Sequence, residues 1–278
     1  MKFRQRPIRR EVNISREHPL KEFFILAGGI VGGFLLLYVL LGLALDSVVL
    51  RIDPELENRL GALMLQSYRE EGDRPPAEEK LQELLDSIVA TIEEPEREYR
   101  VHLSPSKAAN AFALPGGHIV VLSGLVSEAE SENELAMVLG HELGHFKDRD
   151  HLRGLGRGLV LIFLSSLLFG TDNSLSTLTT SVLGGAEMQF SQHQETQADE
   201  WGLTLLVRRY GHAGGATAFF RRLAEKEEGK ELVYLFASHP FPKERVEIIE
   251  EKIGEGGIPV EEEVPLDPAY LEAAEKEE

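Results

Sequence analysis

The chain has no cysteine among its 278 residues, and it has few basic residues, with 29 Lys plus Arg against 47 Asp plus Glu. The absence of cysteine excludes a disulfide-stabilised module, a thiolate zinc site and a cysteine nucleophile, because each of these requires sulfur. The formal net charge of −18 argues against a nucleic-acid partner, because a negative surface repels phosphate. The length and the hydrophobic fraction of 42% fit one domain with its own core plus additional segments.

The charge is distributed unevenly along the chain. Residues 1–23 contain seven basic and three acidic side chains, a net charge of +4, so the remaining residues carry −22. The next 22 residues, 24–45, contain no charged side chain. As a helix with a rise of about 1.5 Å per residue, this run is long enough to cross a hydrocarbon layer roughly 30 Å thick. We therefore predict one N-terminal transmembrane helix.

A cleaved signal peptide and a buried core helix are the two other interpretations of residues 24–45. The run is longer than a signal-peptide core of about 7–15 residues, and it does not end in a small-residue cleavage site. The basic excess before it predicts a cytoplasmic tail over 1–23 and an extracytoplasmic position for the rest, which in a bacterium is the periplasmic side of the inner membrane. The run contains two G-x-x-x-G spacings, which could let two such helices pack together in a homo-oligomer. The alternative is that the glycines have no such role, because glycine is frequent in membrane helices.

The pattern of apolar residues beyond the anchor predicts a mainly helical α+β domain. We expect helices over 54–69, 77–92, 131–145, 186–209, 214–228 and 243–253, a strand over 97–103, and a small antiparallel hairpin of 111–114 and 118–122 around a Pro-Gly-Gly turn. Residues 158–183 contain two apolar stretches around a polar turn, which predicts a helical hairpin that either packs in the core or faces the membrane. The tail over 254–278 is acidic with scattered prolines, and we expect it to be loosely ordered.

The segment His141-Glu142-Leu143-Gly144-His145 carries the strongest local signal for chemistry. On a helix, residues four apart lie on the same face, so both imidazoles can bind one Zn²⁺ ion. Zinc lowers the pKa of a bound water, and Glu142 can take the proton of that water as it attacks a peptide carbonyl. Glu142 can then pass the proton to the leaving amine. This pattern predicts a zinc-dependent peptidase.

A catalytic zinc needs a third protein ligand, and the sequence offers two candidates. His151 lies six residues after His145, as in the metzincin pattern, but Asp148 stands where that pattern has a glycine to turn the chain back. Glu195 is the other candidate, and Asp199 follows it by one helical turn. One carboxylate of this pair could bind the metal while the other orients a ligating histidine.

Four motifs, in this order, resemble those of the M48 zinc metallopeptidases, which include the CAAX prenyl endopeptidases, the HtpX-type heat-shock proteases and the Oma1-like proteases. They are the Asn110–Gly117 segment, His141–His145, Glu195-x-x-Ala198-Asp199, and Ser238-His239-Pro240 with Arg245. The resemblance covers about residues 50–253 and implies a zincin-type metallopeptidase domain. The sequence departs from the family pattern at two positions. Gln192 stands where many members have Arg, and His151 follows the second histidine ligand by six residues, whereas members often have a histidine at five.

The resemblance implies a role for each motif. It implies one Zn²⁺ per chain held by His141, His145 and Glu195, with Glu142 as the catalytic base and Asp199 as an outer partner of a ligand. The 111–114 and 118–122 strands, with Ala111, Phe112 and Ala113, would supply an edge strand for extended substrates, and His239 or Arg245 would stabilise the oxyanion.

Two functions follow from these expectations. The first is a membrane-anchored zinc endopeptidase that acts on misfolded, membrane or envelope polypeptides, with lipid contacts through its N-terminal helix. The second is a chaperone-like or scaffolding protein that retains a zinc site and acts mainly by binding clients. A glutamate beside the metal-binding histidines favours the first, because a scaffold has no use for a base at that position.

Overall fold

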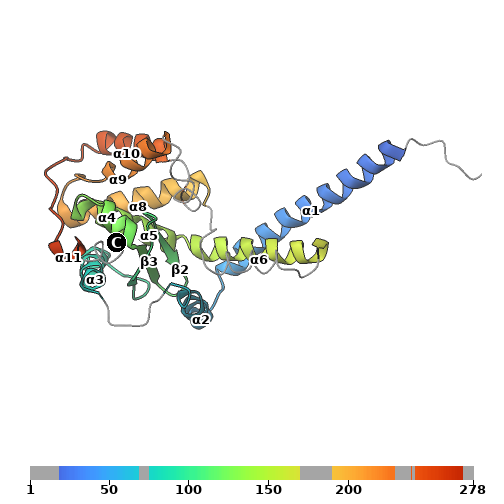
Figure 1. Ribbon diagram of the computed structural model, residues 1–278, viewed down its shortest axis with the longest axis horizontal. Helices are drawn as coiled ribbons and strands as arrows, with labels where there is room; N and C mark the ends of the chain where they lie inside the picture. Colours follow the sequence, from blue (N-terminus) through green and yellow to red (C-terminus); the bar gives the residue numbers. More distant parts are fainter. Residues whose placement is uncertain (1–18, 69–74, 170–189, 229–238, 240–241, 272–278) are drawn as a thin grey trace, which may run out of the picture.

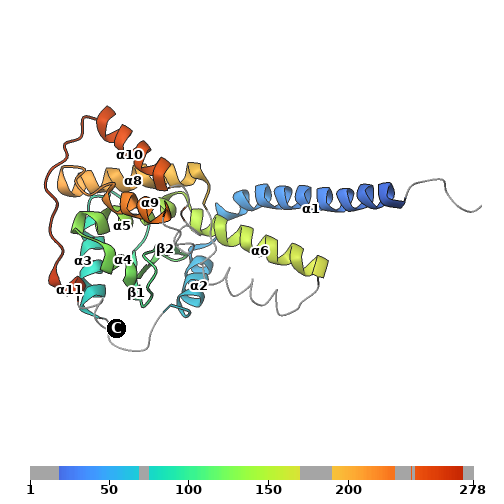
Figure 2. The same cartoon turned by 45° about the horizontal axis from the view of Figure 1, so that its top comes forward.

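The computed structural model describes residues 19–68, 75–169, 190–228, 239 and 242–271. The described chain is mainly helical, and one small sheet lies among the helices of its globular part (Figure 1). Two helices, α1 (Pro19–Val49) and α6 (Asp150–Phe169), extend from the same side of that part in both views (Figures 1 and 2). The predicted class, a mainly helical α+β chain preceded by one apolar helix, is confirmed.

Helix α1 contains the whole predicted span over 24–45 and extends beyond it at both ends. Its most apolar 18-residue window has a mean hydropathy of 2.5, and none of that window is buried within the chain. Thirty-one residues at about 1.5 Å each give a helix of roughly 46 Å, longer than the hydrocarbon layer of about 30 Å. It is the one helix in the described part of the chain that is long and apolar enough to cross a membrane.

The sheet has three strands in the order β1 (Arg100–Ser104), β3 (His118–Leu122), β2 (Ala111–Leu114). Strands β2 and β3 form the predicted antiparallel hairpin, and both glycines of its turn have φ values of 82° and 83°, which favour glycine. Strand β1 pairs parallel with β3, a pairing that the sequence pattern did not indicate. Because β3 lies in the centre, only β2 of the two hairpin strands is at an edge, which corrects the expectation that both supply an edge strand.

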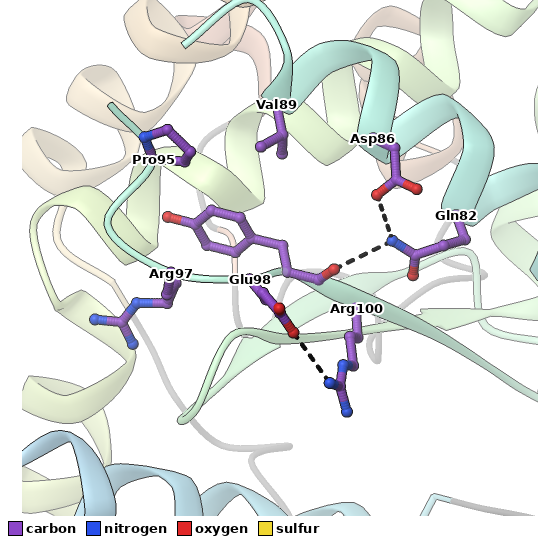
Figure 3. Close-up of a pocket in the computed structure, with 8 residues that line it drawn as sticks. Gln82, Asp86, Val89, Pro95, Arg97, Glu98 and Arg100 are labelled. Carbon is purple, nitrogen blue, oxygen red and sulfur yellow. Dashed lines mark hydrogen bonds and ion pairs between the residues drawn. The ribbon is translucent and has the colours of Figure 1, made fainter. Parts of the chain in front are cut away.

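The other edge of the sheet is covered by side chains of α3 (Pro76–Val89). The backbone N–H of Val101 donates to Gln82 Oε1 at 2.8 Å, and that of Leu103 donates to Glu78 Oε2 at 2.9 Å. Figure 3 shows Gln82 at this position, in the wall of a surface pocket of about 420 Å³ beside the start of β1. These bonds occupy the backbone N–H groups of β1 that point away from β3. Strand β2 is therefore the other edge of the sheet, where a further strand could pair.

Helix α5 (Glu132–Lys147) packs closely against α8 (Gln192–Tyr210), and small residues allow the close approach. A Cβ atom on Gly144 would lie 2.7 Å from the Cα of Ala198, and one on Gly140 would lie 3.1 Å from the Cα of Gly202. The glycine within the His141–His145 motif is therefore needed for packing as well as for spacing the motif. This contact places the motif against the Glu195–Asp199 face of α8.

Shorter helices complete the globular part. They are α2 (Pro54–Leu65), α4 (Ser123–Glu128), α9 (Ala218–Glu228), α10 (Pro242–Glu255) and α11 (Pro268–Leu271). The predicted helices over 54–69, 77–92, 131–145, 186–209, 214–228 and 243–253 correspond to α2, α3, α5, α8, α9 and α10 with shifted ends. The first apolar stretch of 158–183 lies in α6, whereas its second stretch and residues 186–189 lie outside the described residues.

The expectation of a loosely ordered tail is wrong for residues 256–271, which we call the C-terminal strap. Its backbone accepts a hydrogen bond at Val264 from the N–H of Glu132 (2.9 Å), at the start of α5. Tyr270 is 1% exposed and donates its hydroxyl hydrogen bond to the carbonyl of Lys80 at 3.2 Å. An acidic composition did not prevent order because these long-range bonds and one buried aromatic ring fix the strap. Residues 272–278 lie outside the described residues.

Candidate metal centre

Two imidazoles of α5 meet at the centre of the site. His141 and His145 are one helical turn apart, and both are at most 2% exposed. Their Nε2 atoms lie 3.1 Å from each other, so both rings direct the same nitrogen toward one point. The i, i+4 spacing predicted this arrangement.

Glu195 on α8 lies across from these two nitrogens. Its Oε2 is 3.6 Å from His141 Nε2, and its Oε1 is 3.5 Å from His145 Nε2. The side chain is fully buried, at 0% exposed. The structure therefore brings together the three residues that the resemblance assigned to the metal.

His239 and Arg245, from the last motif, also reach the site but in different ways. His239 Nδ1 lies 3.1 Å from Glu195 Oε1 and 3.2 Å from His141 Nε2, and its Nε2 lies 3.6 Å from Glu142 Oε1. Arg245 is 3% exposed and donates to Asp199 from Nε (2.8 Å) and Nη2 (2.7 Å), and its Nη1 lies 2.8 Å from Glu195 Oε2. Arg245 thus holds two carboxylates in place, whereas His239 faces the centre.

The second ring nitrogen of each histidine on α5 contacts a carboxylate. His141 Nδ1 lies 2.8 Å from Asp199 Oδ1, and His145 Nδ1 lies 3.2 Å from Asp150 Oδ2. A carboxylate that accepts from Nδ1–H leaves the lone pair on Nε2, which is the form that binds a metal. Asp199 was expected in this role, but Asp150 was missed. Its signal was its place, five residues after His145, where the resemblance led us to look for a histidine.

The two imidazoles have pKa values shifted in opposite directions. Burial lowers the pKa of His141 to about 3, and the neighbouring Arg245 guanidinium acts in the same direction. Burial also acts to lower the pKa of His145, but its hydrogen bonds to Asp150 and Glu195 outweigh this and raise it to about 10. The carboxylates around His145 therefore favour a positive charge there, whether a proton or a metal cation.

The donor atoms and charges of the site fit a divalent cation. His141, His145, Glu195 and His239 each offer one ligand atom, and these atoms lie within 4.8 Å of one another. Four carboxylates at the site, those of Glu142, Asp150, Glu195 and Asp199, are at most 1% exposed, whereas the only buried Lys or Arg among the described residues is Arg245. Because unpaired buried charges are costly, this excess of negative charge is suited to a bound cation.

Glu142 lies beside the donor atoms with one oxygen unused. It is 1% exposed, and burial raises the pKa of its carboxyl. Within the described part of the chain, no group hydrogen-bonds its Oε2 or the Nε2 of His239. Two buried polar atoms without partners at the same place indicate a position for a ligand.

The structure places His151 away from this centre. The ring is buried, its Nε2 lies 3.2 Å from Glu57 Oε1, and its Nδ1 lies 3.4 Å from the carbonyl oxygen of His145. The metzincin alternative required His151 to turn back toward the other two histidines, but α6 begins at Asp150 and carries it toward α2. Gln192, the other departure, lies at the start of α8, where Ser191 and Gln194 form a capping box.

Comparisons with known proteins agree with this geometry. The family model described as Peptidase family M48 matches residues 75–253. The metalloprotease LoiP of Escherichia coli is 35% identical over 166 residues, which cover 58% of this chain and 64% of that protein. The mitochondrial metalloendopeptidase OMA1 of Schizosaccharomyces pombe is 28% identical over 209 residues (73% and 59%), and the E. coli metalloprotease YcaL is 31% identical over 163 residues (57% and 63%). The chain thus spans less than two thirds of the length of these relatives.

Proposed function

The chain belongs to peptidase family M48, and from this premise we propose that it is a membrane-anchored, zinc-dependent endopeptidase that cleaves misfolded, membrane or envelope proteins. The observation that carries the proposal is the convergence of His141, His145 and Glu195 beside a carboxyl oxygen of Glu142 that no described residue hydrogen-bonds. A family of metallopeptidases implies a metal cofactor, and histidine with carboxylate is the ligand set of hydrolytic zinc sites. The glutamine variant of Glu142, described in the Discussion, tests the proposal.

In the proposed mechanism one zinc ion per chain is held by His141, His145 and Glu195. When bound, zinc supplies a Lewis acid that polarises the peptide carbonyl and makes water acidic enough to lose a proton near neutral pH. Glu142 accepts that proton on Oε2, and its raised pKa lets it keep the proton until the amine of the broken peptide bond takes it. Asp199 and Asp150 hold the two imidazole rings in their ligating orientation.

Between the two candidates for stabilising the oxyanion, the contacts favour His239. Arg245 uses its guanidinium on Asp199 and Glu195 and also packs over the ring of Phe220, at 4.3 Å. His239 Nε2 lies 3.6 Å from Glu142 Oε1 and has no hydrogen-bond partner among the described residues, and as an N–H it could donate to the negative oxygen that forms on the substrate. We therefore assign to Arg245 the positioning of the two carboxylates, and to His239 the stabilisation of the oxyanion on the substrate.

Strand β2 is the proposed site for an extended substrate. Asn110 accepts a backbone hydrogen bond from Leu122 (2.9 Å), so in the antiparallel pairing the residues that bond β3 are Asn110, Phe112 and Leu114. The backbone groups of Ala111 and Ala113 therefore point away from β3, and of their two N–H groups that of Ala111 already donates to Asn110 Oδ1 at 3.0 Å. A peptide that adds to this edge would form main-chain hydrogen bonds that do not depend on its sequence, as suits a protease of misfolded proteins.

Replacing Ala113 by proline is expected to raise KM for an unfolded substrate about 3–10-fold, because it removes one outward N–H worth about 0.5–1.5 kcal/mol. The bonds from β2 to β3 are kept, since the N–H of residue 113 does not point to β3. The variant Ala113→Gly retains the N–H and serves as the matched control. Steady-state cleavage of a quenched fluorescent polypeptide measures both, and equal KM values in the two variants would contradict strand addition.

For the membrane, the proposal is a single-pass anchor, α1, with the basic tail over 1–23 in the cytoplasm and the peptidase domain outside it. The basic excess before α1 supports this orientation. Helix α6 runs beside α1, since Arg157 lies 3.8 Å from Asp46 and a Cβ on Gly156 would touch the side chain of Leu45. Beyond Arg157, α6 extends from the globular part on the same side as α1 and diverges from it at an angle, as Figure 2 shows.

This part of α6 exposes large apolar side chains, as a lipid contact requires. The exposed fractions are 44% for Leu159, 45% for Leu161, 54% for Phe163 and 59% for Leu167. From Gly156 to Phe169 the helix rises about 20 Å, less than the roughly 30 Å of a full crossing. The chain also returns to the site, because Phe190 stacks on His145 with ring centroids 4.0 Å apart. We therefore propose that α6 dips into the outer leaflet without crossing it.

The absence of cysteine allows a clean test, because a single introduced thiol is the only one in the chain. In vesicles with the peptidase domain outside, the thiol of Phe163→Cys is expected to resist a membrane-impermeant maleimide and to react after detergent is added. The control is Arg59→Cys on α2, whose side chain is 74% exposed, and which should react in both conditions. Equal labelling rates for the two variants in intact vesicles would show that α6 lies in water.

A further inference from the structure

Three arginines at helical spacing, Arg149, Arg153 and Arg157, all contact the end of α1, and we call them the arginine clasp. Arg149 Nη1 donates to the carbonyl of Val49, the last residue of α1, at 3.0 Å. Arg153 Nε and Arg157 Nη2 lie 3.5 and 3.8 Å from Asp46 Oδ1. Cations at this end of a helix interact favourably with the free carbonyls and the negative end of its dipole.

The backbone of the clasp is also adapted to α1. Arg149 has a φ of 56°, the only positive value among the described residues other than glycine. This left-handed conformation is unfavourable for a side chain as large as arginine, by about 1 kcal/mol, so its contacts must hold it. Gly156 leaves room for Leu45, because a Cβ there would lie 2.4 Å from a methyl carbon of that leucine. The end of α1 is thus seated against α6 and is more than a flexible tether.

One member of the clasp joins α1 to the candidate metal centre. Arg153 Nη1 lies 3.3 Å from Asp150 Oδ1, in addition to the contact of its Nε with Asp46. Asp150 in turn contacts His145 Nδ1 through its other oxygen, and Gln194, beside Glu195, donates to its Oδ1. Asp46 is therefore linked to a proposed zinc ligand through two side chains, Arg153 and Asp150.

We propose that the anchor helix is part of the active-site support: by holding Arg153, Asp46 fixes Asp150 and so the orientation of His145. This inference rests on the proposed function, since it takes His145 as a metal ligand. The Asp46 side chain is 39% exposed, but its Oδ1 atom is buried and has no hydrogen-bond partner in the described part of the chain, and the Arg153 and Arg157 guanidiniums lie beside that atom. When Asp46 is replaced by the uncharged asparagine, Arg153 loses its ion pair with α1 and holds Asp150 less firmly. Loss of an outer partner of a ligand typically lowers metal affinity about 10–100-fold.

The test compares Asp46→Asn, Arg153→Gln and the double variant in the full chain, purified in detergent. Arg157→Gln is the matched control, because Arg157 shares the contact with Asp46 but not the contact with Asp150. Zinc affinity is measured by competition with a chromogenic chelator, and KM and kcat are measured on the same samples. We expect a loss of zinc affinity of about 3–10-fold for Asp46→Asn and about 10-fold for Arg153→Gln, with KM unchanged and less than a twofold change for Arg157→Gln.

The double variant decides whether the effect passes through Arg153. If Asp46 acts through Arg153, the double variant loses no more affinity than Arg153→Gln alone. Additive losses, or a loss in Arg157→Gln equal to that in Asp46→Asn, would overturn the proposal. A wild-type protein that binds zinc but cleaves nothing would contradict the proposed function alone, because the affinities would still report on the coupling.

Discussion

Replacing Glu142 by glutamine is expected to reduce cleavage of an unfolded protein at least about 100-fold and to leave the metal bound. Transfer of a proton by a positioned side chain typically contributes about 10²–10⁴-fold to a rate, and an amide cannot accept the proton. The substitution keeps the shape of the side chain and removes the charge of one of the four buried carboxylates at the site, so the site retains its donor atoms. Activity on a fluorescent polypeptide and metal content by mass spectrometry measure the two parts of the expectation.

The same pair of measurements separates the peptidase from a client-binding scaffold. A scaffold would hold unfolded clients equally well with Glu142 or glutamine and would show no cleavage in either form. Full activity in Glu142→Gln would instead refute the proposed mechanism. The wild type is also expected to contain about one zinc per chain, because the described residues form a single group of this kind. A proteomic comparison of membranes with either form would then identify substrates as proteins that accumulate in the variant.

The elements that the sequence predicted well are those with local signals. The helix that carries His141 and His145 follows from spacing within one turn, and Ser131 caps its start by accepting from the N–H of Glu134 at 3.2 Å. The hairpin follows from a Pro-Gly-Gly turn between two apolar runs, and the long apolar helix α1 follows from an uncharged run. In each case the residues that decide the structure lie close together in the sequence.

The features that were missed depend on contacts between distant segments. The C-terminal strap is ordered by a bond between Glu132 and Val264 and by the burial of Tyr270, none of which composition can reveal. The parallel pairing of β1 with β3 depends on how the chain crosses over between them. The contact between Asp46 and Arg153 joins residues more than a hundred positions apart, and periodicity within either helix does not predict it.

The candidate site shows the same division. Glu195 could be recognised only as one of two candidates from the residues themselves, because its fifty-residue distance from His145 says nothing of where α8 packs. The close approach of α5 and α8 at Gly144 and Ala198 is what brings Glu195 to within 3.6 Å of the two histidine Nε2 atoms. Asp150 was overlooked because its place, five residues after His145, was considered only for a histidine, and its contact at 3.2 Å between Oδ2 and His145 Nδ1 is visible only in the structure.

Replacing Glu195 by alanine is expected to lower zinc affinity by more than the roughly 10–100-fold that loss of an outer partner causes, because it removes a donor atom itself. The loss has a second cause. Arg245 Nη1 lies 2.8 Å from Glu195 Oε2. In the variant the buried guanidinium loses one of its carboxylate partners, so its positive charge is less well compensated and opposes the binding of a metal cation nearby. Competition with a chelator of known affinity measures the change, and cleavage should fall together with zinc occupancy.

The matched control is His151→Gln, because His151 was the rival third ligand. Glutamine can keep a hydrogen bond to Glu57, whose carboxylate has a pKa lowered to about 2: burial acts to raise it, but the bonds to His151 and Arg97 outweigh burial. Zinc affinity in His151→Gln is expected to remain within about threefold of the wild type, since its ring contacts Glu57 and not the donor atoms of the site. The opposite result, with affinity lost in His151→Gln and kept in Glu195→Ala, would move the third ligand to α6. It would also mean that the close packing of α5 on α8 has a structural role only.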